Sequence, residues 1–330
     1  MTTPLTVGPH PSAPTRAGAA DTRWARAARW ALLTLGLLAP LAPAHAALRV
    51  LACEPEWAAL THELGGDLVE VSSATTAQQD PHQIQARPSL IARARNADLL
   101  VCTGAELEVG WLPILLRQSG NARIQPGQPG HFAAADFVNK LDVPTSVDRS
   151  QGDVHGAGNP HVHTDPRNIA RVAEALLATL QKVDAAHAAQ YQQRAQDFTR
   201  RWQAAMARWT QQAAPLRGLR VAVQHKAYTY LEDWLGLQVV AVLEPKPGVE
   251  PSAAHLQQLL ASLKATPARL VMYSAYQDSK ASDWLSRNGA IPAVRLAFTV
   301  GGNDQARDLF GLFDDTLARL LAAASAKAPG

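Results

Sequence analysis

The feature that most constrains the fold is a regular alternation of short apolar runs with helix-like segments. The first three apolar runs are Leu48–Ala52, Val69–Ser72 and Ala97–Thr103. Helical patterns at residues 57–64 and 88–96 separate them, and the same rhythm resumes after Gly218. Strands separated by helices favour parallel sheets covered on both faces. We therefore expect an α/β fold with two similar lobes, each a parallel-type sheet flanked by helices.

A long amphipathic segment lies between the two halves. From about Ala185 to Ala213, bulky apolar residues recur every three or four positions, which is the helical period. A helix of this length would extend about 40 Å at 1.5 Å per residue. We expect it to join the lobes, which gives a first lobe at residues 47–184, a linking helix at 185–215 and a second lobe at 216–330.

The first 46 residues have the pattern of a cleaved signal peptide. Arginines precede an apolar run at Trp30–Leu41, and Ala44-His45-Ala46 offers small residues at a cleavage site. The run is too short to cross a bilayer core of about 30 Å. We therefore expect residues 1–46 to be removed on export, and the rest of the chain to be periplasmic.

Charge and cysteine content narrow the possible functions. Residues 1–46 carry four arginines and one aspartate, so they account for the whole net charge of +3. A neutral remainder does not attract nucleic acid over long range. Two cysteines follow the signal segment, Cys53 and Cys102. An oxidising compartment permits a disulfide between them, but two buried thiols fit the sequence equally well.

Three histidines stand where a strand or loop passes into a helix. They are His82, His161 and His225. Such positions form the ligand crevice of open α/β sheets. Pro81 and Pro160 restrict the backbone just before the first two histidines. Neutral imidazole nitrogen is a good ligand for Zn²⁺, so the three rings are candidate metal ligands.

Asp304 is a candidate fourth ligand. It follows the turn Thr299–Asn303 at another handover from strand to helix. A carboxylate there could complete a tetrahedral zinc site. The alternative role is that of a helix N-cap, for which Asp is well suited.

Several segments together resemble the metal-binding solute-binding proteins of bacterial ABC importers for zinc and manganese. These segments are DPHQIQARPS (80–89), NADLLVCTGAELE (96–108), GNPHVHTDPRN (158–168), VAVQHKAYTYLEDWLGL (221–237) and FTVGGNDQARDLFGLFD (298–314). The resemblance implies two lobes joined by one long rigid helix, with the metal site in the cleft. It implies His82, His161, His225 and Asp304 as ligands, an ABC transporter permease as partner and, we expect, a monomer.

The chain departs from the family pattern at two places. The stretch at about 146–158 contains only His155 where zinc members carry a His-rich loop. His163 stands where an aromatic or aliphatic residue is commoner, so it is either an additional ligand or a packing residue. We keep both His155 and His163 as possible auxiliary metal ligands.

The metal and the class of activity follow from the ligand set. The resemblance implies that manganese members replace the third histidine by glutamate, so His225 favours Zn²⁺ over Mn²⁺. The alternatives are a manganese-binding member, a zinc-dependent hydrolase or an adhesin. The catalytic patterns HExxH and GxSxG are absent. We therefore expect a zinc-capture protein rather than an enzyme.

Overall fold

The computed structural model describes residues 1–6, 8–13, 46–146, 148, 152 and 154–326. The predicted signal segment lies for the most part outside these residues, since 14–45 are not described. Residues 47–330 form one compact unit. In the part of the chain that is described, no helix combines the length and apolar character needed to cross a membrane.

The first lobe contains a parallel sheet of strand order β2-β1-β3-β4. Its strands are β1 (Leu48–Ala52), β2 (Val69–Ser73), β3 (Leu99–Cys102) and β4 (His131–Ala133). Its helices are α2 (Pro55–Gly65), α3 (Pro88–Asn96) and α4 (Leu112–Ser119). Each helix has a proline in its first turn, where the missing N–H would have no partner anyway.

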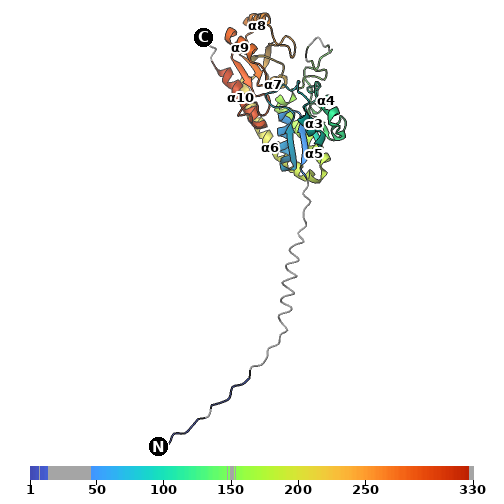
Figure 1. The fold of residues 1–330 in the computed structure, drawn as a ribbon. Helices are drawn as coiled ribbons and strands as arrows, with labels where there is room; N and C mark the ends of the chain where they lie inside the picture. Colours follow the sequence, from blue (N-terminus) through green and yellow to red (C-terminus); the bar gives the residue numbers. More distant parts are fainter. Residues whose placement is uncertain (7, 14–45, 147, 149–151, 153, 327–330) are drawn as a thin grey trace. The chain divides into compact units, whose positions relative to one another are not determined.

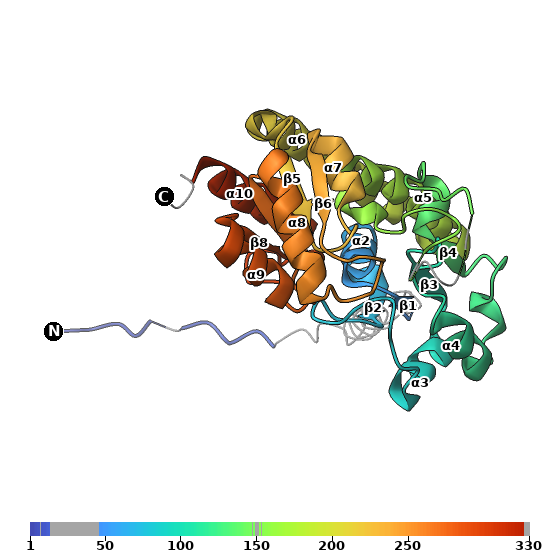
Figure 2. The same cartoon turned by 90° about the horizontal axis from the view of Figure 1, so that it is seen from above.

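The second lobe repeats this arrangement with the order β6-β5-β7-β8, again all parallel. Its strands are β5 (Arg220–Val223), β6 (Gln238–Val242), β7 (Leu270–Ser274) and β8 (Ala293–Leu296). Its helices are α7 (Thr229–Leu235), α8 (Ala253–Ala265), α9 (Lys280–Gly289) and α10 (Leu309–Ser325). The two sheets lie side by side in Figure 2. The predicted fold class is confirmed.

Two long helices lie between the sheets along the chain, α5 (Pro166–Val183) and α6 (Ala188–Gln212), and α6 corresponds to the linking helix expected at 185–215. The 25 residues of α6 extend about 37 Å, and the helix runs along the molecule in Figure 1. Its apolar stripe is buried as predicted, and it includes Tyr191, Phe198, Trp202 and Trp209. One hydrophobic cluster contains this stripe together with residues of both sheets, so the lobes share a core.

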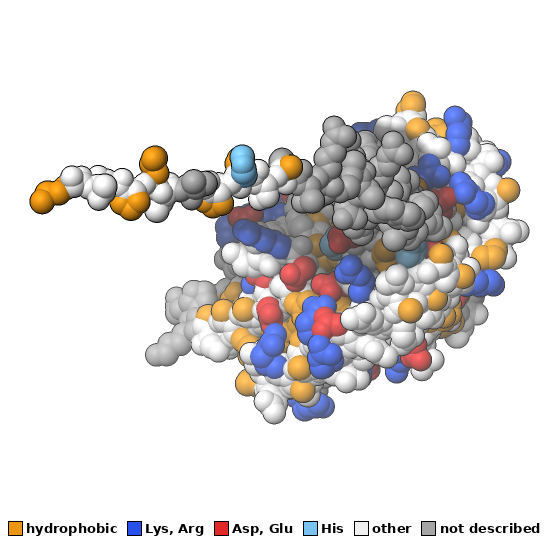
Figure 3. Space-filling model, turned by 90° about the horizontal axis from the view of Figure 1, so that it is seen from below, with side chains coloured by type: hydrophobic (Ala, Val, Ile, Leu, Met, Phe, Trp, Pro, Cys, Tyr) orange, Lys and Arg blue, Asp and Glu red, His pale blue; other side chains and the backbone are white. Residues whose placement is uncertain are grey.

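Short 3-10 segments complete the architecture among the described residues. They are η1 (Gly66–Leu68), η2 (Ala122–Ile124), η3 (Ala134–Phe137), η5 (Val162–Thr164), η6 (Ala185–His187) and η7 (Ala214–Leu216). The surface mixes cationic and anionic side chains on the face shown in Figure 3, in keeping with a neutral net charge after residue 46.

Three local features differ from the sequence-based prediction. Helix α4 and strand β4 were not predicted, because eight and three residues carry too little periodicity. The last helix begins at Leu309 rather than at Asp304. Asp308 is its N-cap, since its side chain accepts a hydrogen bond from Gly311 N. The N-cap alternative for Asp304 is therefore wrong.

Cys53 and Cys102 form a disulfide at the carboxyl edge of the first sheet. Cys53 directly follows β1 and Cys102 is the last residue of β3, and the register of these two strands pairs Ala52 with Val101. The Cα atoms of the cysteines are 4.7 Å apart, within the range that a disulfide requires. The pairing of β1 with β3 thus brings the two cysteines together, and the structure contains the disulfide rather than the two buried thiols that the sequence also allowed.

Two buried carboxyl groups, Glu54 and Glu108, lie beside this disulfide, each 2% exposed. Thr103 donates its backbone N–H to Glu108 and its hydroxyl to Glu54. Burial raises the pKa of Glu108 to about 7, against the pull of its backbone donors. Burial, followed by the negative charges of Glu108 and Glu56, raises the pKa of Glu54 well above its usual value. The folded protein therefore holds protons here that the unfolded chain releases.

This proton retention predicts a pH-dependent gain in stability for the Glu54→Gln variant. Because the folded pKa values exceed the unfolded ones, the wild type loses stability as pH rises from about 4.5 through about 7. A neutral amide avoids this loss. By urea unfolding, the stability of the variant relative to the wild type should be higher at pH 8.5 than at pH 5, because Glu54 of the folded wild type resists losing its proton. Exposed Glu70→Gln is the control; a stability difference between Glu54→Gln and wild type that is the same at both pH values would contradict the assignment.

Candidate metal centre

His82 is fixed by the residues just before it in the loop between β2 and α3. Asp80 Oδ1 accepts hydrogen bonds from His82 N at 3.0 Å and lies 2.7 Å from His82 Nδ1. The indole of Trp111 donates to the Pro81 carbonyl at 2.8 Å, which ties the loop to the first lobe. One imidazole nitrogen is thus held by a carboxylate, which leaves Nε2 for another partner.

His161 lies deeper, in the segment that leads into α5, and only 1% of its surface is exposed. Its backbone N–H donates to Asn159 Oδ1 at 3.0 Å, and its carbonyl accepts from the Thr164 hydroxyl at 2.9 Å. Its ring meets the ring of Phe298 edge-on, with centroids 5.5 Å apart. These contacts fix both the backbone and the ring.

His225 follows β5 by two residues, at the carboxyl edge of the second sheet. Its Nδ1 lies 2.7 Å from Glu244 Oε2. Glu244 comes two residues after β6, the neighbouring strand, and the same oxygen accepts from Gly248 N at 2.9 Å. His225 therefore has the same carboxylate support as His82, built from an unrelated part of the chain.

The three histidines converge. Their ligand atoms all lie within 4.8 Å of one another, and their ring centroids are 5.4 to 6.0 Å apart. Nitrogens around a tetrahedral ion at about 2.1 Å are about 3.4 Å apart, so small ring movements would suffice. Nε2 of His82 is buried and, among the described residues, has no hydrogen-bond partner. The donor set and this orphaned nitrogen fit a divalent metal ion.

The pKa values of His161 and Asp80 are both shifted in the direction that favours binding of a cation. Burial, and then the neighbouring histidines beginning with His82 and His225, lower the pKa of His161 well below its usual value. This ring is therefore neutral at physiological pH and has a lone pair to donate. Burial opposes ionisation of Asp80, but its hydrogen bonds to His82 outweigh that effect and lower the pKa of the carboxyl.

Asp304 is not brought to this group. Its side chain is exposed, and its backbone carbonyl accepts a hydrogen bond from Arg307 at 2.7 Å. Among the residues that the structure describes, the metal-capable group here consists of the three histidines alone. His155 does lie beside them, because its ring stacks on that of His82 with centroids 5.2 Å apart.

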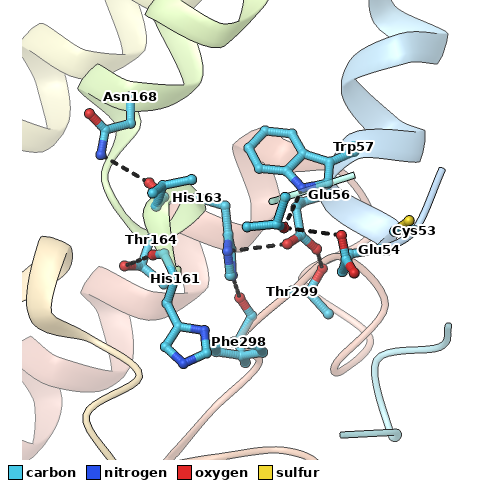
Figure 4. Close-up of polar contacts among 12 residues, drawn as sticks. Cys53, Glu54, Glu56, Trp57, His161, His163, Thr164, Asn168, Phe298 and Thr299 are labelled. Carbon is cyan, nitrogen blue, oxygen red and sulfur yellow. Dashed lines mark hydrogen bonds and ion pairs between the residues drawn. The ribbon is translucent and has the colours of Figure 1, made fainter. Parts of the chain in front are cut away.

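His163 instead connects the two lobes (Figure 4). Its ring is 1% exposed, with Nε2 3.1 Å from the Phe298 carbonyl and Nδ1 3.1 Å from Glu56 Oε1. The Thr299 hydroxyl donates to the other oxygen of Glu56. Glu56 belongs to α2 of the first lobe, whereas Phe298 and Thr299 follow β8 of the second. A packing role therefore describes His163 better than a ligand role.

Phe298 is a site residue that the sequence did not reveal. Its φ of 67° lies in the left-handed region, which costs a residue other than glycine about 1–3 kcal/mol. Its ring contacts the rings of His161 and His163, with centroid distances of 5.5 and 4.8 Å. The strained backbone conformation therefore places the Phe298 ring against both histidines. Only its position after a strand could have indicated this role.

A cavity of about 460 Å³ adjoins the histidines. Its lining includes Asp80, His82, His225, Glu244, Tyr276 and Trp284. Two further carboxylates, Glu250 and Asp278, also line the cavity. One cationic side chain, Lys280, is among the lining residues. The cavity thus carries an excess of negative charge beside the imidazoles, which attracts cations.

Comparison with known proteins gives a consistent result. Residues 50–323 match the family described as zinc-uptake complex component A, periplasmic (ZnuA). The chain is 22% identical over 242 residues to the zinc-binding lipoprotein AdcA of Streptococcus pneumoniae serotype 4, covering 70% of the chain and 46% of AdcA. It thus spans about half the length of that relative. The manganese ABC transporter substrate-binding lipoprotein PsaA of Streptococcus pneumoniae is 21% identical over 261 residues, covering 76% of the chain and 80% of PsaA.

Among solved structures, a crystal structure of ZnuA has a TM-score of 0.70 at 21% identity, covering 85% of the chain and 100% of that structure. At this identity the likeness concerns the fold. The family match, in contrast, extends over most of the sequence. The protein therefore belongs to the ZnuA family of periplasmic zinc-uptake components.

Proposed function

We propose that the protein captures one divalent metal ion, zinc in preference to manganese, and delivers it to an ABC transporter permease. The observation that carries this proposal is the convergence of His82, His161 and His225, whose ligand atoms lie within 4.8 Å of one another. Each ring is oriented by a separate contact, so little conformational entropy is lost when the ion binds.

The preference for zinc rests on the ligand chemistry. Imidazole nitrogen suits Zn²⁺, whereas Mn²⁺ favours carboxylate, carbonyl and water oxygen. Relatives with both zinc and manganese in their names match this chain, so the family alone leaves the metal open. The fourth coordination position falls to a water molecule or to His155, which stacks on His82.

The route to the site and the delivery step extend the proposal. The acidic cavity beside His82 and His225 attracts the cation and leads it to the rings. The family is a component of an uptake complex, which supports a membrane permease as the acceptor of the ion. Export by the signal sequence at residues 1–46 would place the protein in the periplasm.

Replacing any one of the three histidines by alanine should weaken zinc binding at least 100-fold, because one of three protein ligands is lost. Competition with a chromophoric chelator at pH 7.5 measures the affinity. His62→Ala, on the exposed face of α2, removes an imidazole elsewhere and should bind like the wild type. Wild-type affinity in all three ligand variants would refute the site.

Isothermal titration should show Zn²⁺ bound at least 100-fold more tightly than Mn²⁺ by the wild type. The His225→Glu variant replaces a nitrogen ligand by a carboxylate and should reduce this ratio at least tenfold. Equal or tighter Mn²⁺ binding by the wild type would overturn the preference for zinc without affecting the position of the site.

A further inference from the structure

Asn159 occupies an unusual place in the hydrogen-bond pattern of the proposed site. It lies two residues before His161 and is only 8% exposed. Its backbone N–H donates to the Leu141 carbonyl at 2.8 Å, and its carbonyl accepts from the Tyr230 hydroxyl at 2.7 Å. Tyr230 belongs to α7 of the second lobe. The backbone of Asn159 is therefore tied to both lobes.

The side-chain amide of Asn159 connects two of the proposed ligands. Its Oδ1 accepts from His161 N at 3.0 Å. Its Nδ2 donates to the Lys226 carbonyl at 2.8 Å and to the Thr229 hydroxyl oxygen at 3.1 Å. Lys226 directly follows His225. One planar group thus joins the backbone at His161 to the backbone beside His225, across the lobes.

The pattern requires an amide. One end must accept from an N–H and the other must donate to a carbonyl, and the partners fix which end is which. Aspartate would set an oxygen against the Lys226 carbonyl, whereas alanine would leave His161 N and that carbonyl without these partners. The bonds form between protein groups only, so they hold the two segments in place without an ion.

We propose that Asn159 is a positioning residue that sets the distance between His161 and His225, so that the site is formed before the ion arrives. This inference rests on the proposed function. Preorganisation raises affinity because the ion does not have to order its own ligands. Loss of the amide should therefore weaken metal binding even though Asn159 does not touch the metal.

Asn121 provides a matched control in the first lobe. It is also buried, at 7% exposed. Its Nδ2 donates to the carbonyls of Ala94 and Ala97 at 2.9 and 2.7 Å, and its Oδ1 accepts from Arg123 N at 3.1 Å. It makes the same kind of bonds, including one to the N–H two residues later, but all of them stay within the first lobe. Asn121→Ala reports the cost of losing a buried amide as such.

The test compares Asn159→Ala and Asn121→Ala with the wild type in three measurements. These are zinc affinity by chelator competition, the melting temperature of the metal-free protein, and the visible d–d spectrum with Co²⁺ as probe. Both variants should melt at lower temperature than the wild type. Only Asn159→Ala should bind zinc at least tenfold more weakly and show altered Co²⁺ bands, because only this variant displaces the ligands.

Asn159→Asp keeps the acceptor for His161 N and serves where the alanine variant does not fold. It should also bind more weakly, despite a negative charge that by itself attracts the cation. Wild-type affinity and Co²⁺ spectrum in a folded Asn159 variant would overturn the positioning role alone. Failure of the wild type and Asn121→Ala to bind zinc would overturn the proposed function, and this inference with it.

Discussion

The account depends on the hydrogen bonds that orient three imidazoles toward one point. A histidine ring on a loop can turn freely, and three such rings would rarely meet without support. Here Asp80 and Glu244 each lie 2.7 Å from the Nδ1 atom of one ring, which directs the remaining nitrogen of that ring. The third ring, His161, is buried against Phe298. The pKa of His161 is lowered by this burial and by its neighbouring histidines, which keeps it neutral.

The fold of the two lobes brings these three imidazole rings together. Both lobes have the same parallel strand order, and the histidines that meet come from the loop after β2 in the first sheet, the segment before α5 and the carboxyl end of β5 in the second sheet. The two lobes share one hydrophobic core that includes the apolar stripe of α6. Buried polar contacts then join the lobes near the histidines. Asn159 bonds to Thr229 and Tyr230 of α7, and Glu56 with His163 bonds to the segment after β8. The position of one lobe against the other is thus specified by several independent contacts.

Much of this architecture could be predicted from the sequence because buried parallel strands are nearly continuous apolar runs and α6 has a clear helical period. The eight residues of α4 and the three of β4 were too short to show a pattern. The pairing of Cys53 with Cys102 depends on β1 lying next to β3. The order of strands in a sheet cannot be predicted from the local sequence.

In the candidate site, too, some residues could be predicted from the local sequence and others could not. His82, His161 and His225 could be identified because each stands where a strand or loop passes into a helix, two of them directly after a proline. Asp80 is close enough in sequence to suggest a role, but Glu244 is nineteen residues from His225 and meets it only because β5 and β6 are paired. Asp304 follows the same sequence rule as the histidines, yet the turn at Asn303 leaves it exposed.

A crystal structure of the zinc-loaded protein, with anomalous diffraction recorded at the zinc edge, tests the central claim most directly. The account predicts one strong peak, with a nitrogen of each of His82, His161 and His225 about 2.0–2.1 Å from it. A zinc peak elsewhere in the molecule, with the three rings uncoordinated, would contradict it.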